Sequence, residues 1–182
     1  MGNSYFITRI SSSRPNGIEN IDHPPPHVNR RAVDDYRANV EHRVENALSV
    51  ACANGHLEIV ELLMKRDNLL VNSHGDYGCS PFYSACQRGR TEVVRFMIKD
   101  SRVDVNNKTL GGVTPLIIAC NNERIEVIKI LLDDERVDVN ARDVNGRYAL
   151  SESIELKKNE IIEIFAQAKI SNPKKYECFS IE

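Results

Sequence analysis

The chain has 182 residues, of which 41% are hydrophobic and 27% are charged, and its formal net charge is −2. A charge this small argues against nonspecific nucleic-acid binding, which requires several cations to neutralise phosphates. No stretch of about 18 apolar residues is present for a transmembrane helix, and residues 11–14 interrupt the apolar run of a secretory signal, so we expect a cytoplasmic protein, with the nucleus as the alternative.

Residues 1–30 come first, and their composition predicts a flexible N-terminal arm. Two stretches rich in Ser, Pro and Gly hold too little apolar surface to offset the entropy of ordering. Residues 24–26 are prolines, which favour polyproline II and serve either as a stiff spacer or as a ligand for an aromatic groove. Gly2 invites an interpretation of N-myristoylation, but Phe6 stands where the motif requires Ser or Thr. Membrane tethering is therefore kept only as an alternative.

Residues 31–45 are expected to form an N-terminal cap or a degenerate finger loop, because residues 38–40 echo the Val-Asn pairs that follow. From residue 46 onward the sequence repeats with a period of 34 residues. The recurring positions are Val71-Asn72, Val105-Asn106 and Val139-Asn140; Gly78, Gly112 and Gly146; and Ala51-Cys52, Ala85-Cys86 and Ala119-Cys120. Such short periods indicate units that cannot bury their apolar face alone and must stack on copies of themselves. The pattern predicts a solenoid.

The second copy shows the internal pattern most clearly, as two short helices followed by a loop. It opens with a proline, which suits a first helical turn, and its residues Phe82, Ala85 and Cys86 share one helical face. Gly89 supplies the positive φ that ends this helix. Thr91 is the expected N-cap of the second helix. The apolar stripe of that helix consists of Val93, Val94, Met97 and Ile98.

These motifs resemble those of ankyrin repeats over roughly residues 38–170. The matching segments are Ser80-Pro81-Phe82 and Thr114-Pro115-Leu116 for the Thr-Pro-Leu signature, residues 54–63 for the inter-helix turn and second helix, and Asp104-Val105-Asn106 and Asp138-Val139-Asn140 for the exit toward the finger. The resemblance implies an all-α solenoid of stacked helix-turn-helix units with short β-hairpin loops, the fingers. We expect repeats near residues 46–79, 80–113 and 114–147, a degenerate capping repeat at 148–172 that completes a domain of residues 46–172, and a tail at 173–182.

The sequence departs from the family pattern at several positions. The period is one residue longer than the usual 33, and we place the extra residue after each second helix. Glu123 stands where the turn glycine is expected, which costs about 1 kcal/mol if this residue is left-handed. The family histidine that follows Thr-Pro-Leu is replaced by Tyr83 and Ile117 in the second and third copies, so we expect looser loops.

The cysteines at positions 52, 86 and 120 share one repeat position. Stacked helices lie about 8–10 Å apart, whereas a disulfide needs Cα atoms within about 7 Å, so we interpret these thiols as core residues rather than a disulfide ladder. Cys79 and Cys178 are the thiols expected to be exposed. The histidines show no zinc spacing with cysteine, so no metal site is predicted.

The sequence contains no phosphate loop, dinucleotide fingerprint, nucleophile elbow or zinc-protease helix, so no catalytic residue, cofactor or enzymatic activity is predicted. The resemblance implies a monomeric adaptor, scaffold or regulator that binds a segment of another protein through its concave face and fingers, without nucleic acid, and without a membrane unless Gly2 is lipidated. A membrane-tethered regulator and a self-assembling structural unit are the alternatives. The predicted contact residues, all expected to face solvent, are Tyr77, Tyr83, Ser84, Gln87, Arg88, Leu110, Ile117, Ile118, Asn121, Asn122, Arg142 and Val144. Because Ile117 and Ile118 are adjacent, one of them is the alternative candidate for filling a gap between helices.

Overall fold

The computed structural model describes residues 46–176. Several of the predictions concern residues outside this range. They are the N-terminal arm with Gly2 and the three prolines at 24–26, the proposed cap or finger at 31–45, and Cys178.

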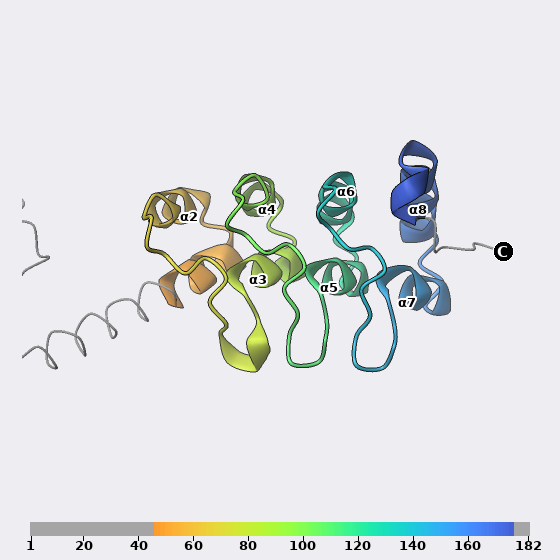
Figure 1. Cartoon of the computed structure of the whole chain (residues 1–182), viewed down its shortest axis with the longest axis horizontal. Helices are drawn as coiled ribbons and strands as arrows, with labels where there is room; N and C mark the ends of the chain where they lie inside the picture. The colour runs from red at the N-terminus through yellow and green to blue at the C-terminus, as the bar shows by residue number, and fades with distance from the viewer. Residues whose placement is uncertain (1–45, 177–182) are drawn as a thin grey trace, which may run out of the picture. The chain divides into compact units, whose positions relative to one another are not determined.

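The described chain consists of four pairs of helices in two rows (Figure 1). The first helices of the pairs are residues 46–54, α3 (Pro81–Arg88), α5 (Pro115–Asn121) and α7 (Ala149–Glu155). The second helices are α2 (Leu57–Met64), α4 (Thr91–Met97), α6 (Ile125–Asp133) and α8 (Asn159–Ser171). Short 3₁₀ helices occupy η1 (Asp76–Gly78) and η2 (Pro173–Tyr176). Helices pack in sequence along each row, α3 on α5 on α7 and α4 on α6 on α8, so the predicted helical solenoid is confirmed.

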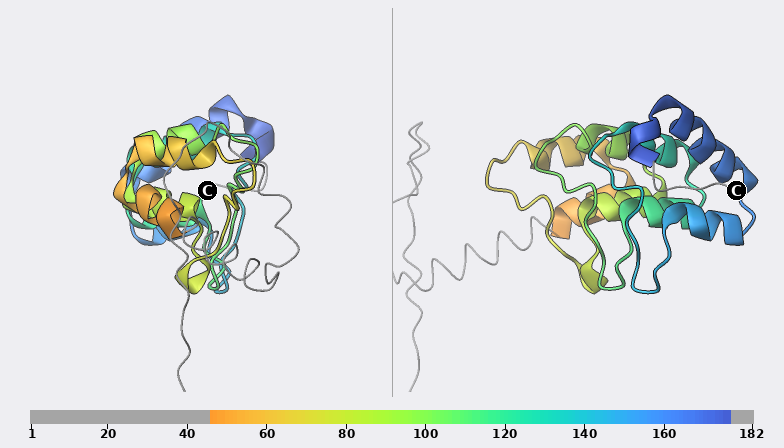
Figure 2. Two further views of the ribbon diagram at one scale, coloured as in Figure 1. Left: turned by 90° about the vertical axis from the view of Figure 1, so that its left-hand side faces the viewer. Right: turned by 45° about the vertical axis from the view of Figure 1, so that its right-hand side comes forward.

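Loops project from the row of first helices, away from the second helices (Figures 1 and 2). We call them fingers and define them as residues 73–79, 107–113 and 141–147. Each finger is closed by a backbone hydrogen bond across its base, of 3.0, 3.1 and 2.9 Å from first to third. None of the described residues is in a β-strand. The hairpin character of each finger consists of this bond and one further backbone bond inside the loop, donated by the glycine at position 78, 112 or 146.

The first helices begin where the sequence predicts. The Ser80 hydroxyl oxygen accepts a 3.1 Å hydrogen bond from the backbone N–H of Tyr83, and Thr114 does the same at 3.3 Å for Ile117. Both helices then start with proline. The prediction that Thr91 caps the second helix is wrong. Arg90 occupies the N-cap position without a side-chain cap, and Thr91 is the first helical residue. The helix starts this early because only Arg90 separates it from Gly89, which ends the first helix.

Cations spaced 34 residues apart tie each repeat to the first helix of the preceding one. Arg90 Nε donates to the carbonyl oxygen of Ala53 at 2.9 Å, and Arg124 Nε donates to that of Gln87 at 3.1 Å. These carbonyls lie in the last turn of a helix, where the C=O groups have no intrahelical N–H donor and the helix dipole favours a cation. Gly89 has φ 69°, and a Cβ atom there would lie 2.7 Å from Arg124 Cδ. The glycine therefore serves both the turn and the close approach of the arginine.

The third repeat makes the same turn without glycine. Glu123 adopts the left-handed conformation with φ 54°, as expected if the family turn is kept. Lys158 takes the place of the arginine in the following repeat and donates through Nζ to the carbonyl oxygens of Cys120 at 3.0 Å and Asn121 at 2.8 Å. It also lies 3.4 Å from the Glu123 carboxylate. Of the three turns contacted by a cation from the following repeat, this one carries a Cβ atom, and its cation is an unbranched lysine. The fourth turn is also made without glycine, at Lys157 with φ 53°.

The second helices are linked by a parallel set of cations. Arg102 Nη2 donates to the carbonyl oxygen of Met64 at 2.7 Å, and Arg136 makes the equivalent contact one repeat later. At the end of the array Lys175 from η2 donates to two carbonyl oxygens at the C-terminal end of α6, at 2.8 and 2.7 Å. Tyr176 beside it is buried against α8. The packed part of the chain therefore includes η2.

The cysteine column lies in the core. Cys52, Cys86 and Cys120 are free and buried, which confirms their interpretation as packing residues. The Cys52 thiol contacts the sulfur of Met97 in the next repeat at 3.4 Å. Burial raises the pKa of Cys52 to about 12, and it also raises that of Cys120 to about 12. These thiols therefore remain protonated at neutral pH.

Candidate functional site

The fingers are locked to one another by their backbones. The N–H of Leu110 donates to the carbonyl oxygen of Tyr77 at 3.0 Å, and that of Val144 donates to Gly111 at 3.1 Å. Gly112, with φ 74°, permits this contact, because a Cβ atom there would lie 3.0 Å from the Val144 nitrogen. Each finger thus holds a fixed register relative to the next.

Apolar side chains stand at the tips of all three fingers. Tyr77, Leu110 and Val144 are 80%, 81% and 72% exposed, and we call them the tip row. Their predicted exposure is confirmed. Leu110 and Val144 are equivalent residues 34 positions apart, whereas Tyr77 lies one position further along its own finger. The hydrogen bonds between the finger backbones keep these three exposed side chains at neighbouring tips.

A second row lies nearer the start of each finger, and its members are equivalent residues. His74, Lys108 and Arg142 are spaced 34 residues apart and all are exposed; we call them the basic row. Lys108 Nζ donates to the Arg142 carbonyl oxygen at 3.4 Å, and Arg142 Nη1 donates to that of Gly146 at 2.7 Å. The Arg142 guanidinium also lies 4.8 Å from the centre of the Tyr148 ring. Of the acidic side chains that the structure describes between residues 46 and 176, none forms an ion pair with Lys108 or Arg142.

The first helices expose fewer of the predicted contact residues than expected. Arg88 and Asn122 are exposed, whereas Ser84, Gln87, Ile118 and Asn121 are half-buried. The prediction that Tyr83 and Ile117 face solvent is wrong, since they are only 5% and 1% exposed. Each lies three residues before a core cysteine and therefore shares its helical face. Ile117 is thus the isoleucine that fills the gap between helices, and Ile118 lies at the edge of the surface.

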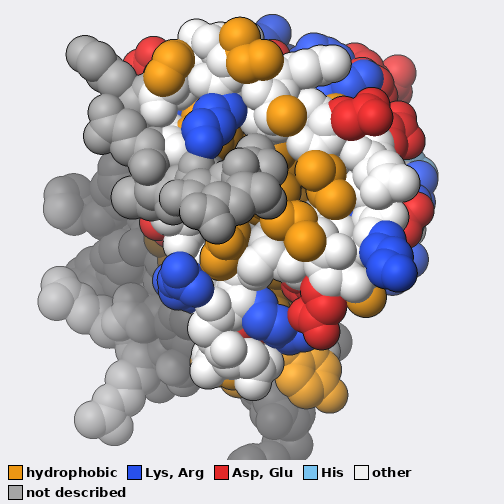
Figure 3. Space-filling model, turned by 90° about the vertical axis from the view of Figure 1, so that its right-hand side faces the viewer, with side chains coloured by type: hydrophobic (Ala, Val, Ile, Leu, Met, Phe, Trp, Pro, Cys, Tyr) orange, Lys and Arg blue, Asp and Glu red, His pale blue; other side chains and the backbone are white. Residues whose placement is uncertain are grey.

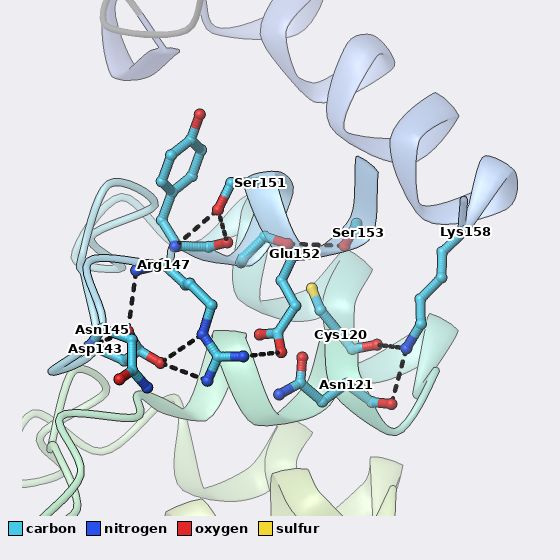
Figure 4. Close-up of polar contacts among 11 residues, drawn as sticks. Cys120, Asn121, Asp143, Asn145, Arg147, Ser151, Glu152, Ser153 and Lys158 are labelled. Carbon is cyan, nitrogen blue, oxygen red and sulfur yellow. Dashed lines mark hydrogen bonds and ion pairs between the residues drawn. The ribbon is translucent and has the colours of Figure 1, made fainter. Parts of the chain in front are cut away.

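The third finger is joined to α7 by a charged network that sequence reasoning missed (Figure 4). Arg147 pairs with Asp143 at 2.9 Å and with Glu152 at 3.1 Å. The Asp143 carboxylate also accepts the backbone N–H groups of Asn145 at 2.8 Å and Arg147 at 2.9 Å. Burial alone would raise the pKa of Asp143, but these hydrogen bonds outweigh it and hold the pKa below its usual value. The acidic residues on either side of Arg147 were the only signal in the sequence.

The two ends of the described array expose apolar residues whose counterparts elsewhere are buried. Ile59 on α2 is 47% exposed, whereas its equivalents Val93 and Val127 are each 1% exposed. At the other end Ile154, which is equivalent to the core cysteines, and Leu156 are exposed. Hydrophobic side chains gather on this C-terminal end of the described part (Figure 3). Within residues 46–176 no further repeat stacks on either end.

No group of three or more His, Cys, Asp or Glu side chains among residues 46–176 lies close enough together to hold a metal ion. None of the helices there combines the length and hydrophobicity needed to cross a membrane.

Comparison with models of known families gives two overlapping matches. One, described as ankyrin repeats (3 copies), covers residues 27–109, and the other, ankyrin repeats (many copies), covers residues 99–151. No curated protein matches the chain. Ankyrin repeats are generally protein–protein interaction modules and are typically non-catalytic. With helix pairs at a 34-residue period, helix starts of the Ser/Thr-Pro type and family matches across residues 27–151, the chain belongs to the ankyrin repeat proteins.

Proposed function

We propose that this chain is a non-catalytic adaptor, scaffold or regulator that binds a segment of another protein across its fingers and the adjoining first helices. The observation that carries the proposal is the tip row, in which three apolar side chains are more than 70% exposed on backbones that are hydrogen-bonded to one another. Exposed apolar groups in a series favour association, and a surface that is already ordered loses little entropy on binding.

The proposed contact surface is the predicted one without its two buried members. It consists of Tyr77, Ser84, Gln87, Arg88, Leu110, Ile118, Asn121, Asn122, Arg142 and Val144. Tyr83 and Ile117 do not belong to this surface, because side chains in the core cannot reach a partner without unfolding the repeat. Tyr and Arg are common anchors of interfaces, which favours Tyr77 and Arg142 as central contacts.

The proposal is tested with a partner that has been identified by affinity capture and then purified. Leu110→Asp combined with Val144→Asp is expected to weaken its binding at least tenfold, about 1.4 kcal/mol, in isothermal titration calorimetry. Leu62→Asp is the matched control, because Leu62 is an exposed apolar residue on α2, away from the fingers. Equal affinity for the double variant and the wild type would exclude the fingers as the binding surface.

Self-assembly is the second candidate, favoured by the exposed apolar residues Ile59 and Ile154 at the ends of the array. We propose a monomeric cytoplasmic protein instead. A molar mass from light scattering that rises with protein concentration, and returns to that of one chain in an Ile59→Asp variant, would establish self-assembly in its place.

A further inference from the structure

The chemistry of the two finger rows identifies the kind of segment that the protein binds. We infer that the ligand is an extended peptide segment in which acidic side chains accompany apolar ones, with about one such pair for each of the second and third repeats. This inference rests on the proposed function, because it assigns a partner chemistry to the same surface.

In the second and third fingers the charges left without an acidic partner are positive. Lys108 and Arg142 of the basic row are exposed, and none of the carboxylates whose side chains the structure describes pairs with them. Asp143 lies in the third finger, but its carboxylate is buried and is occupied by Arg147 and by backbone N–H groups. A ligand carboxylate can therefore pair with the basic row without meeting an exposed anion from Asp143.

Exposed residues of the opposite charge lie in the segments that lead from α4 and α6 to the second and third fingers; we call these segments the exit turns. Asp104 and Asp138 are equivalent residues in the two exit turns, and both are exposed. An acidic ligand is therefore disfavoured along the exit turns and favoured along the fingers, although the whole chain has a net charge of only −2. Such complementarity selects the partner and its orientation.

The spacing of the rows suits an extended chain. Packed helices of successive repeats are about 8–10 Å apart, and an extended peptide advances about 3.3 Å per residue. One repeat then corresponds to about three ligand residues. Over the second and third fingers, each group of three presents one apolar side chain to Leu110 or Val144 and one carboxylate to Lys108 or Arg142, and the hydrogen bond between these fingers keeps the two pairs in step.

The ligand carries apolar residues as well as acids because Leu110 and Val144 lie two residues beyond Lys108 and Arg142 in the same fingers. A nucleic acid would instead require several phosphate contacts, and two unpaired cations supply too few. The combination of charge and apolar surface therefore favours a peptide.

The test is a selection of random dodecapeptides displayed on phage against the intact chain. Peptides enriched on the wild type should contain more Asp and Glu than Lys and Arg, together with apolar residues. Selection on the Lys108→Glu, Arg142→Glu variant should lose or reverse this acidic excess. The control variant is Lys65→Glu, Lys99→Glu, which changes two exposed lysines that follow second helices. It should enrich the same acidic peptides as the wild type.

The strongest peptide is then synthesised with a fluorescent label and titrated by anisotropy. The Lys108→Glu, Arg142→Glu variant should bind it about tenfold more weakly at low salt, since each exposed charge pair contributes modestly and two are reversed. The difference should shrink in about 1 M NaCl, where the screening length is near 3 Å. Circular dichroism confirms that each variant is folded.

The outcomes separate the two proposals. Enriched peptides without an acidic excess, which still lose affinity for the Leu110→Asp, Val144→Asp variant, would overturn the ligand chemistry and leave the finger surface in place. Peptides whose binding is unaffected by both finger variants would overturn the finger surface itself. Binding of a nucleic-acid oligomer more tightly than any selected peptide would replace the peptide with a polyanion.

Discussion

Gly89→Ala is expected to destabilise the second repeat through two effects. Alanine at φ 69° costs about 1–2 kcal/mol, because its Cβ atom crowds the following carbonyl in the left-handed region. The new Cβ atom would also lie 2.7 Å from Arg124 Cδ, which forces this side chain to shift. The 3.1 Å bond from Arg124 to the Gln87 carbonyl oxygen then weakens, at a further cost of about 1 kcal/mol. The total loss in the free energy of unfolding is about 2–3 kcal/mol.

The contribution of the arginine is isolated with Arg124→Lys, which copies the arrangement that Lys158 has beside Glu123. The double variant Gly89→Ala, Arg124→Lys should be less destabilised than the sum of the single variants, by about 1 kcal/mol, because the slimmer lysine accommodates the Cβ atom. Urea unfolding followed by circular dichroism and by intrinsic tyrosine fluorescence measures each free energy. Both probes must show the same transition for these values to be compared.

Gly111→Ala is the matched control. Gly111 lies in a finger, its φ is not in the left-handed region, and the nearest atom to an added Cβ is 3.8 Å away. It should therefore change stability by less than about 1 kcal/mol, and in the stabilising direction. If Gly89→Ala costs no more than Gly111→Ala, or if the effects of Gly89→Ala and Arg124→Lys simply add, the proposed coupling between turn and arginine is refuted.

The buried thiols and the C-terminal segment give two further predictions. The pKa of Cys52 and of Cys120 is raised from its ordinary value of 9.0 to about 12, so the unfolded chain loses these protons first. Their contribution to stability is complete below about pH 9 and is lost as the pH rises toward about 12, and a Cys52→Ala, Cys120→Ala variant should show a flatter decline in urea unfolding across that range. Tyr176→Ala should lower the free energy of unfolding by about 3 kcal/mol, because it removes a buried aromatic ring beside α8. Ile170→Ala near the end of α8 is the control, because Ile170 is 80% exposed, and an equal effect of the two would contradict the packing role of Tyr176.

Several features follow from the sequence because they depend on local chemistry. The 34-residue period determined the number and order of helix pairs. Ser80 and Thr114 marked helix starts because a hydroxyl followed by proline caps a helix wherever it occurs. Glu123 was expected to be left-handed because it occupies the turn position of the repeat, and its φ of 54° agrees.

The sequence predicted the exposure of the finger tips correctly and that of two first-helix residues wrongly, for a physical reason. Residues at finger tips, such as Leu110, protrude beyond the packed helices, so repeat position alone predicted their exposure. For the first helices, exposure depends on how neighbouring helices approach. Tyr83 and Ile117 occupy positions that a polar histidine fills in the family pattern, and only the packing of α3 on α5 and of α5 on α7 shows that both are buried.

The sequence by itself determined the repeat, the helix starts, the core cysteines and the apolar finger tips, because each depends on interactions within one repeat or on strict periodicity. Only the tertiary structure decided which cation reaches which carbonyl: Arg124 bonds Gln87 and Lys175 bonds the end of α6, at separations of 37 and of 41 to 43 residues. Such contacts join groups on different repeats, and their existence depends on distances that stacking sets. A linear pattern shows that a cation recurs, whereas the folded chain shows which helix end it stabilises.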